Sequence, residues 1–186
     1  MKNKYLTYSN LLSLLRLLLA VPFWFLLDGI KEGENLTVIV LLVFVGAISD
    51  YLDGYLARKL NQISEVGKML DPLADKVCIG VITIKLFLIG YISPLFFCMI
   101  LGRDLLIFLG GIYLSSRLKK VIPSNMLGKI SVSFIALILL LVTLQVNQEN
   151  FWFQSVYILT LGLIIISFVA YAIRAMEILK GKHEII

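Results

Sequence analysis

Charged residues are scarce in this sequence. Only 16% of its 186 residues are Asp, Glu, Lys or Arg, and 60% are hydrophobic, whereas about a quarter of the residues in a soluble domain are charged. The mean hydropathy is +0.95. Such a chain cannot hide its apolar side chains from water, which excludes an ordinary soluble globular protein. We therefore expect a lipid bilayer as its solvent.

Cysteine and histidine are also rare. Cys78 and Cys98 both lie in apolar runs, and the single histidine, His183, lies in a polar tail. Two separated cysteines in apolar surroundings behave as small hydrophobic residues and do not form a disulfide framework. Without a Cys-x-x-Cys pair or further histidines, we do not expect a zinc site.

Long apolar runs are abundant. Six segments are each close to the ~20 residues that a helix needs to cross a bilayer, and they lack the alternation of a membrane strand. They cover roughly residues 9–28, 36–60, 70–90, 93–114, 126–145 and 151–172. The sequence predicts an all-α, polytopic membrane protein, a six-helix bundle that forms a single domain over residues 1–186.

The basic residues predict how this bundle is oriented. They gather in the N-terminal segment, the second and fourth connections and the C-terminal tail. These residues are Lys2, Lys4, Arg58, Lys59, Lys68, Arg117, Lys119, Lys120, Arg174, Lys180 and Lys182. The positive-inside rule places both termini in the cytoplasm. The same asymmetry accounts for the net charge of +5, so we do not expect a nucleic-acid partner.

Four aspartates lie at the ends of two apolar runs. The run over residues 36–49 is too short to cross a bilayer, so its helix must continue through Asp50 and Asp53 to about residue 60. The next helix must likewise include Asp71 and Asp75. Because the two helices run in opposite directions, both acidic pairs are expected at one depth, near the cytoplasmic face.

Helical spacing favours a shared site. Asp50 and Asp53 are three residues apart, and Asp71 and Asp75 are four apart, so each pair occupies one helix face. Four converging carboxylates would repel one another at this depth unless a hard divalent cation, such as magnesium, manganese or calcium, joined them. Interfacial ion pairs with Arg58, Lys68 and Lys76 are the less favoured alternative.

Residues 50–75 carry a complete family signature. They read D-Y-L-D-G-Y-L-A-R, eight residues, then G-K-M-L-D-P-L-A-D. This resembles the pattern D-x2-D-G-x2-A-R-x8-G-x3-D-x3-D of the CDP-alcohol phosphatidyltransferases, without departure in spacing. The segments Asn10–Arg16, Asp71–Lys76 and Leu127–Ile130 resemble the phosphatidylglycerophosphate synthase branch. Six helices are expected for the family.

The resemblance implies a role for each signature residue. Asp50, Asp53 and Asp71 would bind two divalent ions, Mg²⁺ or Mn²⁺, and Asp75 would share in that site and act as the general base. Close approach of the cytidine nucleotide would depend on Gly54, Ala57 and Gly67, and Arg58 would bind the diphosphate. The partners implied are CDP-diacylglycerol, an alcohol acceptor and membrane lipids, in a homodimer of the bacterial inner membrane with its active site toward the cytoplasm.

The acceptor is less well defined. Arg103 and Asp104 lie in the middle of a predicted span, where charge is costly. They could form an internal ion pair, or Arg103 could bind the phosphate of the acceptor, with Arg117 and Lys129. Lys85 is expected to extend toward the bilayer interface.

Several cations near a cavity favour glycerol 3-phosphate as the acceptor. The Arg-Asp pair also resembles the cardiolipin synthases of the family, whose acceptor is phosphatidylglycerol, and an inositol phosphate is a third alternative. A cation transporter is the alternative from another class, but it predicts carboxylates near the bilayer centre and repeated halves, and neither is evident.

Overall fold

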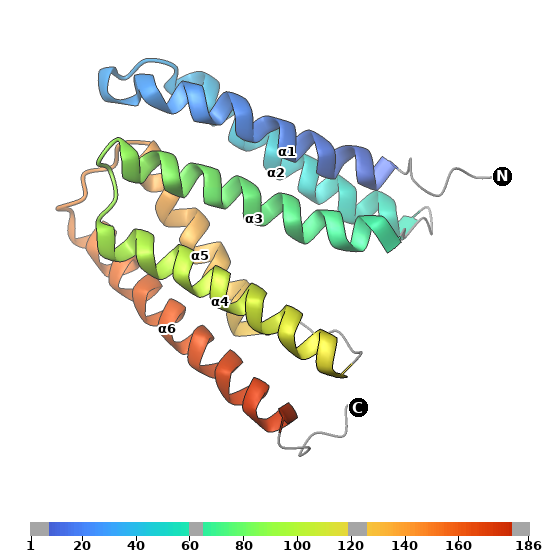
Figure 1. The fold of residues 1–186 in the computed structure, drawn as a ribbon. Coiled ribbons are helices and arrows are strands. Elements are labelled where there is room, and N and C mark those ends of the chain that lie inside the picture. The colour runs from blue at the N-terminus through green and yellow to red at the C-terminus, as the bar shows by residue number, and fades with distance from the viewer. Residues whose placement is uncertain (1–7, 60–64, 119–125, 180–186) are drawn as a thin grey trace. The chain divides into compact units, whose positions relative to one another are not determined.

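The computed structural model describes the backbone over residues 8–59, 65–118 and 126–179. Within these ranges it has six α-helices and one 3-10 helix (Figure 1). The elements are α1 (Tyr8–Leu26), η1 (Leu27–Glu32), α2 (Leu36–Lys59), α3 (Glu65–Leu88), α4 (Pro94–Leu118), α5 (Met126–Thr143) and α6 (Phe151–Leu179). Side chains are described at residues 14–15, 17–49, 74, 76–114 and 126–177.

The predicted all-helical class is confirmed over the described residues, where there is no strand. Helix α2 ends at Lys59, as the short apolar run required, whereas α3 begins at Glu65 rather than near residue 70. Three helices in the described ranges are long and apolar enough to cross a membrane: Pro94–Leu114, Met126–Thr143 and Phe151–Glu177. The count of six spans and the cytoplasmic termini stay predictions.

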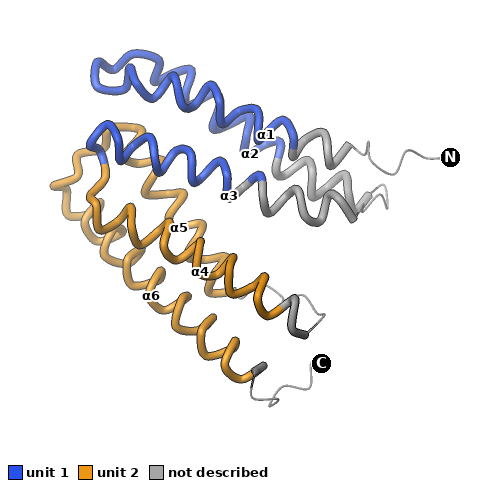
Figure 2. Tube along the Cα trace, in the orientation of Figure 1, with its two compact units in different colours: residues 1–91 blue, residues 92–186 orange. Residues whose placement is uncertain are grey.

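The helices form two compact units (Figure 2). Unit 1 covers residues 1–91 and contains α1, η1, α2 and α3. Unit 2 covers residues 92–186 and contains α4, α5 and α6. That the whole chain makes one membrane domain stays a prediction.

Unit 1 is organised around its first helix. Helix α1 contacts both α2 and α3. The buried side chains of Phe23, Leu27 and Ile30 follow one another at helical spacing, and Leu86 of α3 is buried in the same unit. Leu18, by contrast, is apolar and exposed. A helix that buries one apolar stripe and exposes another is typical of a protein surrounded by lipid.

Unit 2 is organised around its last helix. Helix α6 contacts both α4 and α5. The Tyr171 hydroxyl of α6 donates to the Ile107 carbonyl of α4 at 3.2 Å. A Cβ added at Gly110 or Gly111 would lie 3.4 Å from the Tyr171 side chain. The small residues of α4 therefore let the tyrosine of α6 come close, as is common between membrane helices.

The ammonium group of Lys85 has partners within unit 1, and its extension toward the bilayer interface stays a prediction. Its side chain is only 8% exposed, and its Nζ lies 2.6 Å from Asp28 Oδ1 of η1. Nζ also lies 4.8 Å from the centre of the Trp24 ring, a distance suited to a cation–π contact. The 3-10 helix η1 was not predicted. Its residue Asp28 lies next to α3, and the Asp28 carboxylate takes the place of water as the partner of the Lys85 ammonium group.

The two members of this ion pair should respond differently to substitution. Asp28 is 59% exposed and Lys85 8% exposed, so removing the carboxylate leaves a buried charge unpaired, whereas removing the lysine leaves a carboxylate that water can solvate. We expect Asp28→Asn to lower the melting temperature in detergent more than Lys85→Met does, and the double variant to recover most of the loss. Lys31→Met, at an exposed lysine of η1, is the control. A larger loss in Lys85→Met would contradict this account.

Candidate active site

The signature residues fall on two consecutive helices of unit 1. Asp50, Asp53, Gly54, Ala57 and Arg58 belong to the final turns of α2, and Gly67, Asp71 and Asp75 belong to the first turns of α3. Both helices are continuous through the aspartate positions, as the span-length argument predicted. With spacings of three and four residues in continuous helices, the two aspartates of each pair therefore lie on the same face of their helix.

The end of α2 and the start of α3 are held close by the chain itself. Only residues 60–64 separate Lys59 from Glu65, and so short a connection reaches at most about 20 Å. The two helices carry the two aspartate pairs at these joined ends. The covalent structure alone thus brings both acidic pairs to one end of unit 1.

The side chains of the four aspartates, of Arg58 and of Ala57 lie outside the described residues, and so do the surroundings of Gly54 and Gly67. Among the side chains that are described, no group of three or more His, Cys, Asp or Glu could hold a metal ion. Ala74, which immediately precedes Asp75, is described and fully buried. The metal set and the nucleotide set therefore stay predictions.

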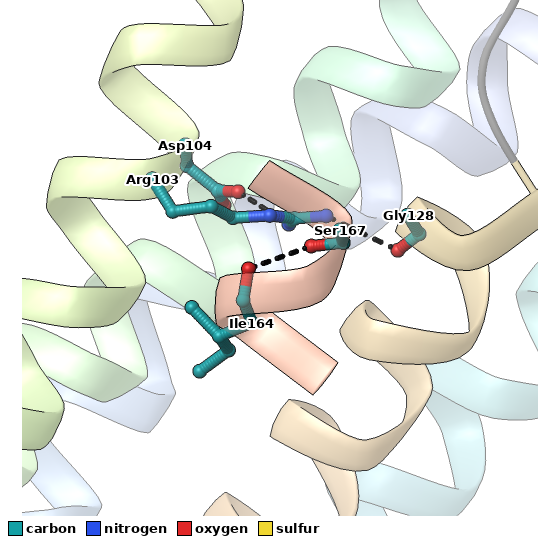
Figure 3. Close-up of polar contacts among 5 residues, drawn as sticks. All are labelled: Arg103, Asp104, Gly128, Ile164 and Ser167. Carbon is teal, nitrogen blue, oxygen red and sulfur yellow. Dashed lines mark hydrogen bonds and ion pairs between the residues drawn. The ribbon is translucent and has the colours of Figure 1, made fainter. Parts of the chain in front are cut away.

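Unit 2 contains a buried arginine. Arg103 lies in α4 with 6% of its side chain exposed, and its Nη1 donates to Asp104 Oδ1 at 2.7 Å (Figure 3). Asp104 is 20% exposed. Of the two alternatives for this pair, the internal ion pair is therefore observed. A role for Arg103 in binding the acceptor stays a prediction.

The same guanidinium reaches a second helix. Arg103 Nη2 donates to the Gly128 carbonyl of α5 at 3.2 Å, and Figure 3 shows the side chain extending from α4 to that carbonyl. A Cβ at residue 128 would lie 3.4 Å from Nη2, so glycine leaves room for the approach. Arg103 thereby connects α4 to the first turn of α5, a link that sequence reasoning did not find.

The other two predicted acceptor residues are placed only in part. Lys129 follows Gly128 in the first turn of α5 and is exposed. Arg117 belongs to the last turns of α4, and its side chain lies outside the described residues. Lys129 is therefore next to the carbonyl that Arg103 contacts, which keeps two of the three predicted cations in one part of unit 2.

Comparison with known proteins decides the family. The sequence model of the CDP-alcohol phosphatidyltransferases matches residues 6–175, which is most of the chain. The chain belongs to this family. The match includes both helices that carry the signature. As a CDP-alcohol phosphatidyltransferase, the chain is an enzyme of phospholipid synthesis and an integral membrane protein with apolar helices, which removes the support for a cation transporter.

Relatives within the CDP-alcohol phosphatidyltransferases carry two kinds of name. A CDP-diacylglycerol–glycerol-3-phosphate 3-phosphatidyltransferase of Aquifex aeolicus is 39% identical over 176 residues, which are 91% of this chain and 96% of the relative. A protein of the same name from Mycoplasma pneumoniae is 33% identical, over 78% of this chain and 69% of its own. A Mycobacterium bovis protein, provisionally named a cardiolipin synthase, is 34% identical over 69% of this chain and 60% of its own.

Proposed function

We propose that the chain transfers the phosphatidyl group of CDP-diacylglycerol to glycerol 3-phosphate and releases CMP. The observation that carries the proposal is the similarity to the Aquifex aeolicus enzyme of that name, which is 39% identical and covers 91% of this chain and 96% of the relative. In this reaction the acceptor hydroxyl oxygen forms a bond to the phosphatidyl phosphorus. The bond from that phosphorus to the oxygen of CMP breaks, and the hydroxyl proton goes to a base.

We expect Asp50, Asp53, Asp71 and Asp75 to hold two divalent ions, Mg²⁺ or Mn²⁺. Carboxylate oxygens are the ligands that such hard cations prefer, and the continuous helices α2 and α3 support a shared donor set. When bound, the metal would neutralise diphosphate charge and make CMP a better leaving group. These ions do not need thiolate or imidazole ligands from the chain.

The remaining signature residues would act on the nucleotide and the proton. Arg58 would bind the diphosphate, because a guanidinium makes two parallel hydrogen bonds to phosphate oxygens. The small residues Gly54, Ala57 and Gly67 would let the cytidine lie against α2 and α3. Asp75 would accept the proton of the acceptor hydroxyl as the new bond forms.

The acceptor and the setting belong to the same proposal. Lys129, Arg117 and Arg103 are the cations we expect near a phosphorylated acceptor, and the exposure of Lys129 supports its part in this. The site would face the cytoplasm from the bacterial inner membrane, where the lipid donor arrives from the leaflet and glycerol 3-phosphate from water. We expect the enzyme to work as a homodimer.

Release of CMP by the purified protein tests the proposal. With CDP-diacylglycerol and Mg²⁺ or Mn²⁺, we expect glycerol 3-phosphate to give the highest rate in a panel that also contains phosphatidylglycerol, inositol phosphate and serine. Addition of EDTA should abolish CMP release, and excess Mg²⁺ should restore it. If no acceptor in the panel gave CMP, the proposed reaction would be wrong; full activity in EDTA would contradict the metal site.

Cardiolipin synthesis is the second candidate. The Arg103–Asp104 pair and the similarity to the Mycobacterium bovis protein favour it. A higher rate with phosphatidylglycerol than with glycerol 3-phosphate would assign the chain to this reaction. An inositol-phosphate acceptor would be assigned in the same way.

A further inference from the structure

One nitrogen of the Arg103 guanidinium, Nε, is buried without a hydrogen-bond partner among the described residues. The Nη1 of Arg103 donates to Asp104 and its Nη2 to the Gly128 carbonyl. Most buried donors in folded proteins have a partner, which can be a protein group, water or a ligand. The side chain is only 6% exposed, so bulk solvent does not supply it.

Ser131 of α5 presents a second group of this kind. Its side chain is fully buried, and its Oγ has no partner among the described residues. Other buried hydroxyls donate within their own helix, Thr83 to Ile79, Thr143 to Leu139 and Ser167 to Ile164. That is the usual way in which a helical serine or threonine is satisfied. Ser131 does not do this, so its hydroxyl remains available to a group from outside α5.

The two unsatisfied groups are connected through Gly128 of α5. Ser131 lies three residues after Gly128, which puts both on one face of α5. Gly128 is the residue whose carbonyl the Arg103 guanidinium reaches. Figure 3 shows that contact, together with the Asp104 carboxylate on the other side of the guanidinium. The guanidinium that carries the Nε–H donor and the buried Ser131 side chain are thus both placed beside Gly128, within unit 2.

Charge decides which chemistry fits this position. The Asp104 carboxylate, 2.7 Å from Nη1, already balances the guanidinium charge. A second anion here would face that carboxylate and be repelled. What remains unmet is a hydrogen-bond acceptor for Nε–H and a partner for Ser131. A neutral hydroxyl oxygen meets both needs, since it accepts from one group while it donates to or accepts from the other.

We propose that one neutral hydroxyl oxygen binds between Arg103 Nε and Ser131 Oγ. It comes either from the alcohol acceptor, as a hydroxyl that does not react, or from an ordered water. If the acceptor supplies the hydroxyl, the inference rests on the proposed function. Arg103 would then recognise a hydroxyl group of the acceptor, and Lys129 and Arg117 would bind its phosphate. The second source would make the position a buried hydration site.

Two acceptors distinguish the sources. Glycerol 3-phosphate and 3-hydroxypropyl phosphate both have a primary hydroxyl and a phosphate, but the second lacks the central hydroxyl. With Ser131→Ala, the loss of one hydrogen bond should lower kcat/KM about tenfold. If the acceptor supplies the oxygen, this loss appears with glycerol 3-phosphate and not with 3-hydroxypropyl phosphate. If water supplies the oxygen, kcat/KM falls by the same factor with both acceptors, and the melting temperature measured without acceptor falls as well.

Ser133→Ala is the matched control, because Ser133 is exposed and donates to the Lys129 carbonyl of its own helix. It should change neither rate nor melting temperature. An experimental map at high resolution should show density within hydrogen-bond distance of both Arg103 Nε and Ser131 Oγ. Unchanged kcat/KM and melting temperature in Ser131→Ala, or a map in which Ser131 donates to a carbonyl of α5, would overturn the proposal. A wild-type enzyme inactive with glycerol 3-phosphate would instead refute the proposed function and leave the map and melting tests valid.

Discussion

Asp75→Asn should abolish CMP release while most nucleotide binding is retained. The amide has the shape of the carboxyl group but cannot accept the proton of the acceptor hydroxyl, and loss of a general base lowers turnover by about 10²- to 10⁴-fold. CMP release and the binding of CDP-diacylglycerol, measured on one preparation, test this. The variant should fold because asparagine has nearly the same size as aspartate and α3 is continuous through this position.

The matched control is Glu32→Gln, the same change of carboxylate to amide at an exposed residue of unit 1. It should leave both turnover and binding unchanged. If Asp75→Asn lost nucleotide binding together with turnover, Asp75 would be a metal ligand only, and the base would have to be found elsewhere.

Arg103→Gln should impair both stability and use of the acceptor. The substitution removes the partner of Asp104, whose side chain is only 20% exposed. It also removes the donor to the Gly128 carbonyl. An unpaired, largely buried carboxylate is destabilising, so the melting temperature should fall by several degrees. The KM for the acceptor should rise far more than the KM for CDP-diacylglycerol.

The double variant Arg103→Gln with Asp104→Asn separates the two effects. It removes the ion pair as a whole and leaves no uncompensated charge, so the melting temperature should return toward that of the wild type. If Arg103 also contacts the acceptor, the raised KM for the acceptor persists in the stable double variant. Recovery of both quantities would make Arg103 purely structural.

The helices were predictable because a bilayer sets their length. An apolar run over residues 36–49 cannot cross a membrane alone, and this simple limit extended α2 through Asp50 and Asp53. The same argument placed Asp71 and Asp75 inside α3. The family followed from the spacing of these residues and was confirmed by the match over residues 6–175.

The partners of buried polar groups were not predictable in the same way. Lys85 was expected to extend toward the interface, but its ion-pair partner was not predicted, because Asp28 lies on η1, a short helix without an apolar pattern. An acid and a base at matching ends of neighbouring helices could have suggested the pair. Periodicity can assign Ser131 to a helix face, but it does not show that the buried hydroxyl has no partner among the described residues, because that depends on which groups the neighbouring helices place around it.

The contact between Lys85 and Asp28 also bears on how the protein is made. A lysine side chain is costly in lipid until a partner covers it, and here the partners, Asp28 and Trp24, both precede it in the chain. They leave the ribosome first and are already present when α3 is synthesised. The C-terminal end of α3 thus becomes stable only once α1 and η1 are in place, which favours assembly of unit 1 in the order of translation.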